Sequence, residues 1–169
     1  MFQIGETVFY SGSGICRIDS ITSREFGDEM RDYYVLIPEH AAKSVVYLPV
    51  DNQALVSRMR APLTEEQVLR LIHKMPEQEC RWIEDENSRK REHQRILRDG
   101  DQREIILLIR SIYLHQQQLR EKGRKLHQCD ERALREGQQM LSDEFSHVLH
   151  IQPEEVENYI IQMLDGQTA

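Results

Sequence analysis

The chain has 169 residues, of which 39% are hydrophobic and 30% charged, and its formal net charge is −7. This length holds one medium domain or two small ones, and the clustering of the apolar residues argues against wholesale disorder. No apolar run approaches the roughly 18 residues of a membrane span, and the start MFQIGETVFY lacks the basic and apolar regions of a signal peptide. Three widely spaced cysteines without a C-x-x-C pair fit unpaired thiols, so we expect a cytoplasmic protein.

The charge is distributed unevenly along the chain. Residues 81–98 carry a net charge of +2 and residues 110–125 a net charge of +4, whereas residues 126–169 carry −7. Because neutralised phosphates supply most non-specific affinity for DNA, such a chain should bind free DNA poorly. A role on DNA would therefore be local and assisted by another protein.

The first sixty residues have the pattern of short strands joined by tight turns. Ser11–Gly14 has turn composition, a bulge or bend is expected near Asp19, and Phe26–Asp28 suggests a hairpin loop. The strands are expected at residues 6–10, 14–21, 31–37, 43–48 and 55–59. Five short strands in this space predict a small SH3- or Tudor-like barrel.

Residues 60–62 form the expected linker, and the pattern after them is helical, which makes the fold class α+β with domains at 1–60 and 61–169. Thr64 and Gln67 form a capping box, and Pro76 ends the first helix. Further helices are expected at about 80–98, at 102–122 with Asp101 as the cap, from about 129, and from Pro153.

The stretch from residue 80 to 98 is the first candidate site. It contains Trp82, the only tryptophan, and six basic residues against four acidic ones. An aromatic ring beside a basic excess can meet a nucleic-acid backbone and touch a base step. The alternative is that Trp82 anchors a core and the charges form a solvated helix face.

Catalytic and metal chemistry find little support in the sequence. Gly12 and Gly14 do not make a phosphate loop, because no lysine and no helix follow them. His147 and His150 lie one helical turn apart without a carboxylate at ligand spacing, so a surface pair is the better interpretation. We expect no enzyme, no cofactor and no metal.

The first domain contains GETVFY at residues 5–10, YVL at residues 34–36 and VYLP at residues 46–49, with Gly14, Ile18, Ile21 and Asn52 between and after them. This ordered pattern resembles the CarD/CdnL family of bacterial transcription regulators. In the helical half, Trp82 falls where the family has its DNA-contacting tryptophan, followed by a basic helix, a Gly-Asp pair and a long apolar helix. Arg24 matches a basic family position that contacts polymerase, and Tyr47 stands where some members have arginine.

The resemblance implies a Tudor-like barrel that docks on the RNA polymerase β subunit and a helical domain that reaches upstream promoter DNA. In that complex the tryptophan would wedge into the minor groove at the edge of the melted bubble, while Arg89, Lys90 and Arg91 hold phosphates. We therefore expect a monomeric, non-enzymatic regulator that binds polymerase through Arg24 and Tyr47 and meets promoter DNA only when polymerase is present. The alternative is a protein–protein adaptor whose helical domain does not touch DNA.

Overall fold

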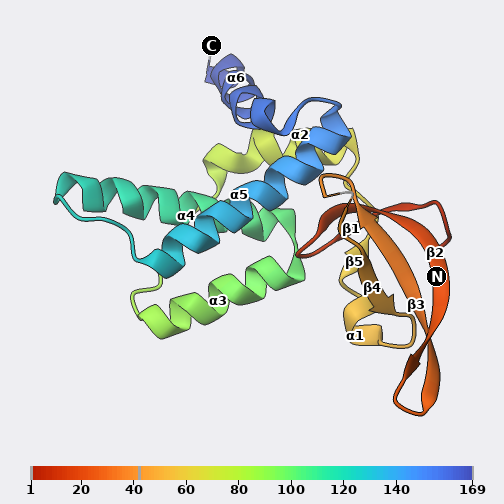
Figure 1. Ribbon diagram of the computed structural model, residues 1–169. Helices are drawn as coiled ribbons and strands as arrows, with labels where there is room; N and C mark the ends of the chain where they lie inside the picture. Colours follow the sequence, from red (N-terminus) through yellow and green to blue (C-terminus); the bar gives the residue numbers. More distant parts are fainter. Residues whose placement is uncertain (1, 42, 169) are drawn as a thin grey trace. The chain divides into compact units, whose positions relative to one another are not determined.

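The computed structural model describes residues 2–41 and 43–168, with side chains to residue 164, and the chain forms two compact units (Figure 1). The units are Met1–Leu63 and Thr64–Ala169, so the division falls after residue 63, whereas the sequence pattern predicts it after residue 60. The first unit is a sheet and the second is helical, which confirms the α+β fold class.

The first unit is a five-stranded antiparallel sheet in the order β4-β3-β2-β1-β5. Alternate side chains on one face of the sheet form its main core, and Phe9 and Ile15, which pair on the other face, are buried as well. The strands are β1 (Thr7–Tyr10), β2 (Gly14–Phe26), β3 (Glu29–Pro38), β4 (Val46–Pro49) and β5 (Met59–Arg60). The core consists of Val8, Cys16, Ile18, Tyr34, Leu36, Leu48 and Met59.

Two predicted irregularities of the sheet are confirmed and one predicted strand is wrong. The β2–β3 register shifts between Ile18 and Ser20, which is the bulge expected near Asp19. Gly27 has a φ of 67° in the hairpin turn, a conformation that glycine adopts at little cost. The strand expected at 55–59 is instead a short helix, α1 (Gln53–Val56), which the Asn52 side chain caps, followed by the two-residue β5.

The β2–β3 hairpin is longer than its neighbours in the sheet. Strand β4 pairs with β3 only from Tyr33 to Leu36, whereas β3 pairs with β2 from Glu29 onward. The end of the hairpin is therefore a two-stranded ribbon that continues past β4 (Figure 1). Within the described residues, neither strand is paired on its outer side at this end, so the backbone edges of both β2 and β3 are available to a partner strand.

The second unit is a helical bundle in which α5 contacts α2, α3, α4 and α6 (Figure 1). Its elements are α2 (Glu65–Lys74), η1 (Met75–Glu77), α3 (Glu86–Asp99), α4 (Gln102–Glu121), α5 (Gln128–Leu149), η2 (Pro153–Glu155) and α6 (Val156–Thr168). Buried aliphatic and aromatic side chains of these helices form the core, among them Val68, Ile72, Ile105, Leu108, Ile112, Met140, Phe145 and Val156.

The caps of the bundle follow the sequence closely, with one important difference. Thr64 forms the predicted capping box with Gln67, and the Asp101 side chain accepts from the first amides of α4. The helix expected to begin near residue 80, however, begins only at Glu86, where the Asp85 side chain caps it. Trp82 therefore lies in an irregular segment, residues 78–85, which we call the Trp82 loop.

Candidate functional site

The Trp82 loop is fixed at both ends by arginine side chains. Arg110 of α4 donates hydrogen bonds to the backbone carbonyls of Met75 and Gln78. Arg89 of α3 donates to the Ile83 carbonyl over 3.0 Å. Because buried or half-buried carbonyls outside a helix need donors, these two arginines stabilise the loop in one conformation.

The indole of Trp82 is half-buried and is held by side chains of two helices. The His115 imidazole of α4 stacks on it, with ring centroids 3.8 Å apart and planes inclined by 10°. The guanidinium carbon of Arg89 lies 4.5 Å from the indole centroid, and His93 meets the ring edge-on at 6.5 Å. Trp82 is therefore neither a fully buried core anchor nor a free surface ring, and part of the indole remains accessible to a partner.

Arg89 does not lie on the surface where the sequence analysis places it. Its side chain is 4% exposed, and its Nε and Nη2 atoms each donate to the Asp130 carboxylate of α5 over 2.9 Å. The reason is helical periodicity, since Arg89, His93 and Ile96 share the face of α3 that turns inward. Arg89 thus stabilises Trp82 and the bundle from inside the unit. Its guanidinium is not exposed, so it does not belong with the surface residues that could bind phosphates.

Asp130 is the residue around which the buried polar groups gather. It is 1% exposed, it pairs with Arg89 in a bidentate arrangement, and its Oδ1 lies 3.8 Å from Nδ1 of His93. The side-chain hydrogen bond to Asp130 is the main reason that the pKa of Arg89 is raised. A buried pair of this geometry is costly to break, because the remaining charge has no solvent to stabilise it.

Two histidines beside Trp82 are held uncharged by their surroundings. Burial lowers the pKa of His93, and the nearby Asp130 carboxylate opposes this shift without cancelling it. Burial also lowers the pKa of His115, and the positive charge of Arg89 acts in the same direction. Both rings are therefore neutral at pH 7 and can pack against the indole without adding charge.

Lys90 and Arg91 are exposed on α3, as the sequence predicts. The next basic residue, Arg95, is different, because Glu92, Asp99 and Glu104 surround its guanidinium at 2.7 to 3.3 Å. The charge of Arg95 is thus balanced within the protein, whereas Lys90 and Arg91 present theirs to solvent.

The structure brings the two candidate polymerase residues together in the first unit. The Arg24 guanidinium lies over the Tyr47 ring at 3.9 Å from its centroid, and Nη2 of Arg24 donates to the Tyr47 hydroxyl over 2.7 Å. Both residues are exposed, Arg24 on β2 and Tyr47 on the edge strand β4. Cation–π contact and hydrogen bond together hold the arginine in one orientation.

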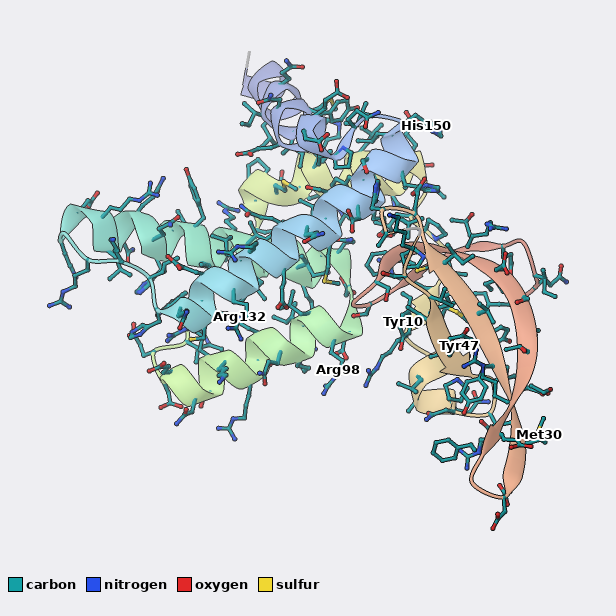
Figure 2. The ribbon with its side chains drawn as sticks, in the orientation of Figure 1. Tyr10, Met30, Tyr47, Arg98, Arg132 and His150 are labelled. Atoms are coloured by element: carbon teal, nitrogen blue, oxygen red, sulfur yellow. The ribbon has the colours of Figure 1, made fainter. Side chains whose placement is uncertain are left out.

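An exposed aromatic side chain lies on the same face of the sheet as this pair. Phe26 of the β2–β3 hairpin is 61% exposed, whereas Ile21 and Met30, 44% and 63% exposed, alternate onto the opposite face. Figure 2 shows Met30 close to the tip of the hairpin and Tyr47 farther along the sheet. An ordered arginine on a sheet that exposes apolar side chains is typical of a surface that a protein partner covers.

Among the residues that the structure describes, no group of three or more His, Cys, Asp or Glu side chains is placed to hold a metal ion. His147 and His150 both lie near the end of α5, where His150 is exposed. Within the same described residues, no helix is both long and apolar enough to cross a bilayer.

Comparison with protein families supplies the decisive observation. Residues 2–60 match the model of the CarD-like/TRCF RID domain, and residues 55–161 match that of the CarD C-terminal domain. The chain belongs to the CarD family. The two matches follow one another in this order and together cover nearly the whole sequence, which confirms the resemblance stated above. A comparison with curated proteins finds no significant match.

Membership of the CarD family identifies the broad role of the protein. The RID domain implies interaction with RNA polymerase and a function in transcription regulation. The family consists of regulatory proteins without a catalytic domain.

Sequence analysis does not identify four residues that support the site, namely His93, Arg110, His115 and Asp130. His115 is a polar residue on a long helix, and nothing in the surrounding sequence indicates that it faces Trp82, thirty-three positions earlier. Arg89 could have been placed correctly, because its spacing to His93 and Ile96 is that of one helix face.

Proposed function

We propose that this protein binds the β subunit of RNA polymerase through the Met1–Leu63 unit and stabilises the promoter open complex through contact of Trp82 with DNA. It acts in the cytoplasm as a monomeric, non-enzymatic regulator that uses no cofactor. The observation that carries the proposal is the state of Trp82 in a CarD-family chain: a half-buried indole on a loop that two arginines hold in place.

Arg24, Tyr47 and the free sheet edge beside them are the proposed polymerase contact. A partner strand gains backbone hydrogen bonds by pairing with an exposed edge, and neighbouring side chains supply specificity. Arg24 is already oriented by Tyr47, so little side-chain freedom is lost when it meets a carboxylate or carbonyl of the partner.

Trp82 is proposed to act at the upstream edge of the melted bubble. Inserting an apolar ring at a base step costs a few kcal/mol of unstacking, and this cost is smaller where the step is already distorted. Closing the bubble would expel the ring. The contact therefore favours the open complex over the closed one, and only such a difference can shift the equilibrium.

Lys90 and Arg91 are proposed to bind the phosphates beside this step. Their contacts carry no sequence information and weaken as salt increases. Arg89 contributes indirectly, because its buried pair with Asp130 fixes the guanidinium that lies over Trp82.

An adaptor function remains the second candidate, and two observations favour it. Arg89 is not available to phosphate, and the exposed carboxylates of Glu84 and Glu86 lie close to Trp82 in the chain. In that case the accessible part of the indole would meet a protein, and the first unit would still bind polymerase.

Footprinting of a promoter with and without polymerase separates these functions. The regulator extends protection at the upstream bubble edge only when polymerase is present, and Trp82→Ala abolishes the extension. The adaptor leaves the footprint of polymerase unchanged. An extension that persists in Trp82→Ala would contradict the proposed role of the ring.

Polymerase binding is tested separately with Arg24→Glu. We expect this variant to bind the β subunit more weakly while its fold is retained, because Arg24 is exposed and outside the core. Arg17→Glu is the matched control, since Arg17 is an exposed arginine on the same strand whose carboxylate partner is Asp19. Equal binding by Arg24→Glu and the parent would show that Arg24 is not part of the contact.

A further inference from the structure

The orientation of Trp82 depends on side-chain contacts because its backbone lies outside any helix or strand. Arg110 and Arg89 hold the backbone of the loop through the Gln78 and Ile83 carbonyls. These backbone contacts do not fix the side-chain torsion angles of Trp82, so the groups that contact the indole ring determine its orientation. His115 stacks in parallel on a face of the indole, and the Arg89 guanidinium carbon lies 4.5 Å from the indole centroid.

His115 is well placed for this task and is not required for the hydrophobic core. Ile105, Leu108 and Ile112 are among the buried positions of α4, whereas Tyr113 and Leu114 beside His115 are 49% and 43% exposed. His115 itself is half-buried, with its flat face against Trp82 at 3.8 Å. A ring at this position contributes little to the packing of α4, but it restricts the indole.

We propose that His115 is a positioning residue for Trp82, which holds the indole through the stack in the orientation that meets promoter DNA. The proposal rests on the proposed role of Trp82 in the open complex. His115 thereby lowers the conformational freedom that the indole would otherwise lose on contact with DNA. The stack also covers part of the indole surface, so the ring meets the base step with the part that stays uncovered.

The charge of His115 matters because other charged groups surround it. Arg89 and His93 face it from α3, Asp130 and His127 from the start of α5, and Glu84 from the Trp82 loop. Burial and Arg89 lower the pKa of the imidazole, so the stack is formed by the neutral ring. Protonation would place a second cation near the Arg89 guanidinium and disfavour the stack.

The first test uses the tryptophan fluorescence of the free protein, excited at a wavelength that the six tyrosines absorb only weakly, and it reports Trp82 because the sequence has no other tryptophan. In His115→Ala we expect the equilibrium constant between the docked and the undocked indole to fall about 2- to 10-fold, which corresponds to the free energy of one stacked aromatic pair. Acrylamide quenching should rise accordingly. His73→Ala, which removes an exposed histidine of α2, is the matched control and should match the parent. Unchanged quenching in His115→Ala would overturn the proposal.

Rescue by a ring without a titrating group tests the stack itself. His115→Phe should restore the low quenching of the parent, because phenylalanine presents a flat ring at the same position. Between about pH 8 and pH 5 the parent should show a fluorescence transition that His115→Phe loses in large part. Any remaining transition belongs to His93, the other histidine beside the indole. Failure of His115→Phe to restore low quenching would exclude stacking as the cause.

Open-complex lifetime distinguishes the positioning role from the function on which it rests. We expect His115→Ala to shorten the lifetime, His115→Phe to restore it, and Trp82→Ala to abolish the effect of the protein. If Trp82→Ala shortens the lifetime and His115→Ala does not, the positioning role is wrong. If neither variant shortens it while quenching changes as expected, the positioning role stands and the proposed function fails.

Discussion

The buried pair of Arg89 and Asp130 gives the most quantitative prediction of this structure. Asp130→Ala removes the carboxylate and leaves the Arg89 guanidinium, 4% exposed, without its bidentate partner. Removing one member of a buried pair costs about 3–5 kcal/mol of unfolding free energy. Arg89 keeps its hydrogen bond to the Ile83 carbonyl and its contact with Trp82, so we expect the lower end, about 3 kcal/mol.

Urea unfolding followed by Trp82 fluorescence measures this loss, since the indole reports on the helical unit. With a urea dependence of about 1–3 kcal/mol per molar, the midpoint should fall by about 1–3 M. The double variant Arg89→Met and Asp130→Leu should recover most of the loss, because it leaves no buried charge. Arg95→Ala is the control, since its three carboxylate partners are solvent-exposed and the change should be much smaller.

A loss below about 1 kcal/mol in Asp130→Ala would refute this reasoning, because that is the range of a solvent-exposed pair. It would mean that Arg89 reaches water when its partner is removed. In that case Arg89 could also turn toward phosphate, and the phosphate-binding set would have to be revised.

Three further predictions concern the helical unit. Stability should decrease as pH falls below about 6.5. The pKa values of His93 and His115 are lowered in the folded protein, so the unfolded chain binds protons first. Thermal unfolding between pH 8 and pH 5 measures this decrease in stability, and a His115→Phe variant should lose part of the decrease. Gly137→Leu should destabilise the bundle by about 1–3 kcal/mol through overpacking. Even a Cβ atom at Gly137 would lie only 3.2 Å from Cγ1 of Ile109. An unchanged urea midpoint would contradict this close approach of α4 and α5. His150→Gly should raise the unfolding free energy by up to about 1 kcal/mol, because His150 has a φ of 57°, and a lower melting temperature would argue against that conformation.

Local sequence signals predicted much of the fold because they act over a few residues. Thr64 with Gln67 and Asp101 before α4 are caps that satisfy nearby amides, and the structure forms both. The bulge after Ile18 was readable because the apolar alternation changes phase there. The start of α3 was misplaced because Asp85, which caps the helix, follows apolar residues that resemble a helix start.

The candidate site was less predictable because its contacts join distant parts of the chain. Arg89 and Asp130 are forty-one residues apart, and no local signal indicates that the Asp130 carboxylate of α5 meets the Arg89 guanidinium. The stack of His115 on Trp82 likewise requires α4 to be packed beside the loop. In contrast, Arg24 and Tyr47 were chosen through family resemblance, and the fold places their side chains in contact.

The lifetime of the promoter open complex with Trp82→Ala tests the central claim most directly. The variant should first be shown by circular dichroism to be folded at the assay temperature, because loss of a half-buried ring costs about 1–3 kcal/mol, less than a fully buried one. Complexes of polymerase and promoter are then challenged with a competitor, and their decay is followed with parent, variant and no added protein. We predict that Trp82→Ala still binds polymerase but that the lifetime falls to the value without the protein. A lifetime equal to that of the parent would contradict the account.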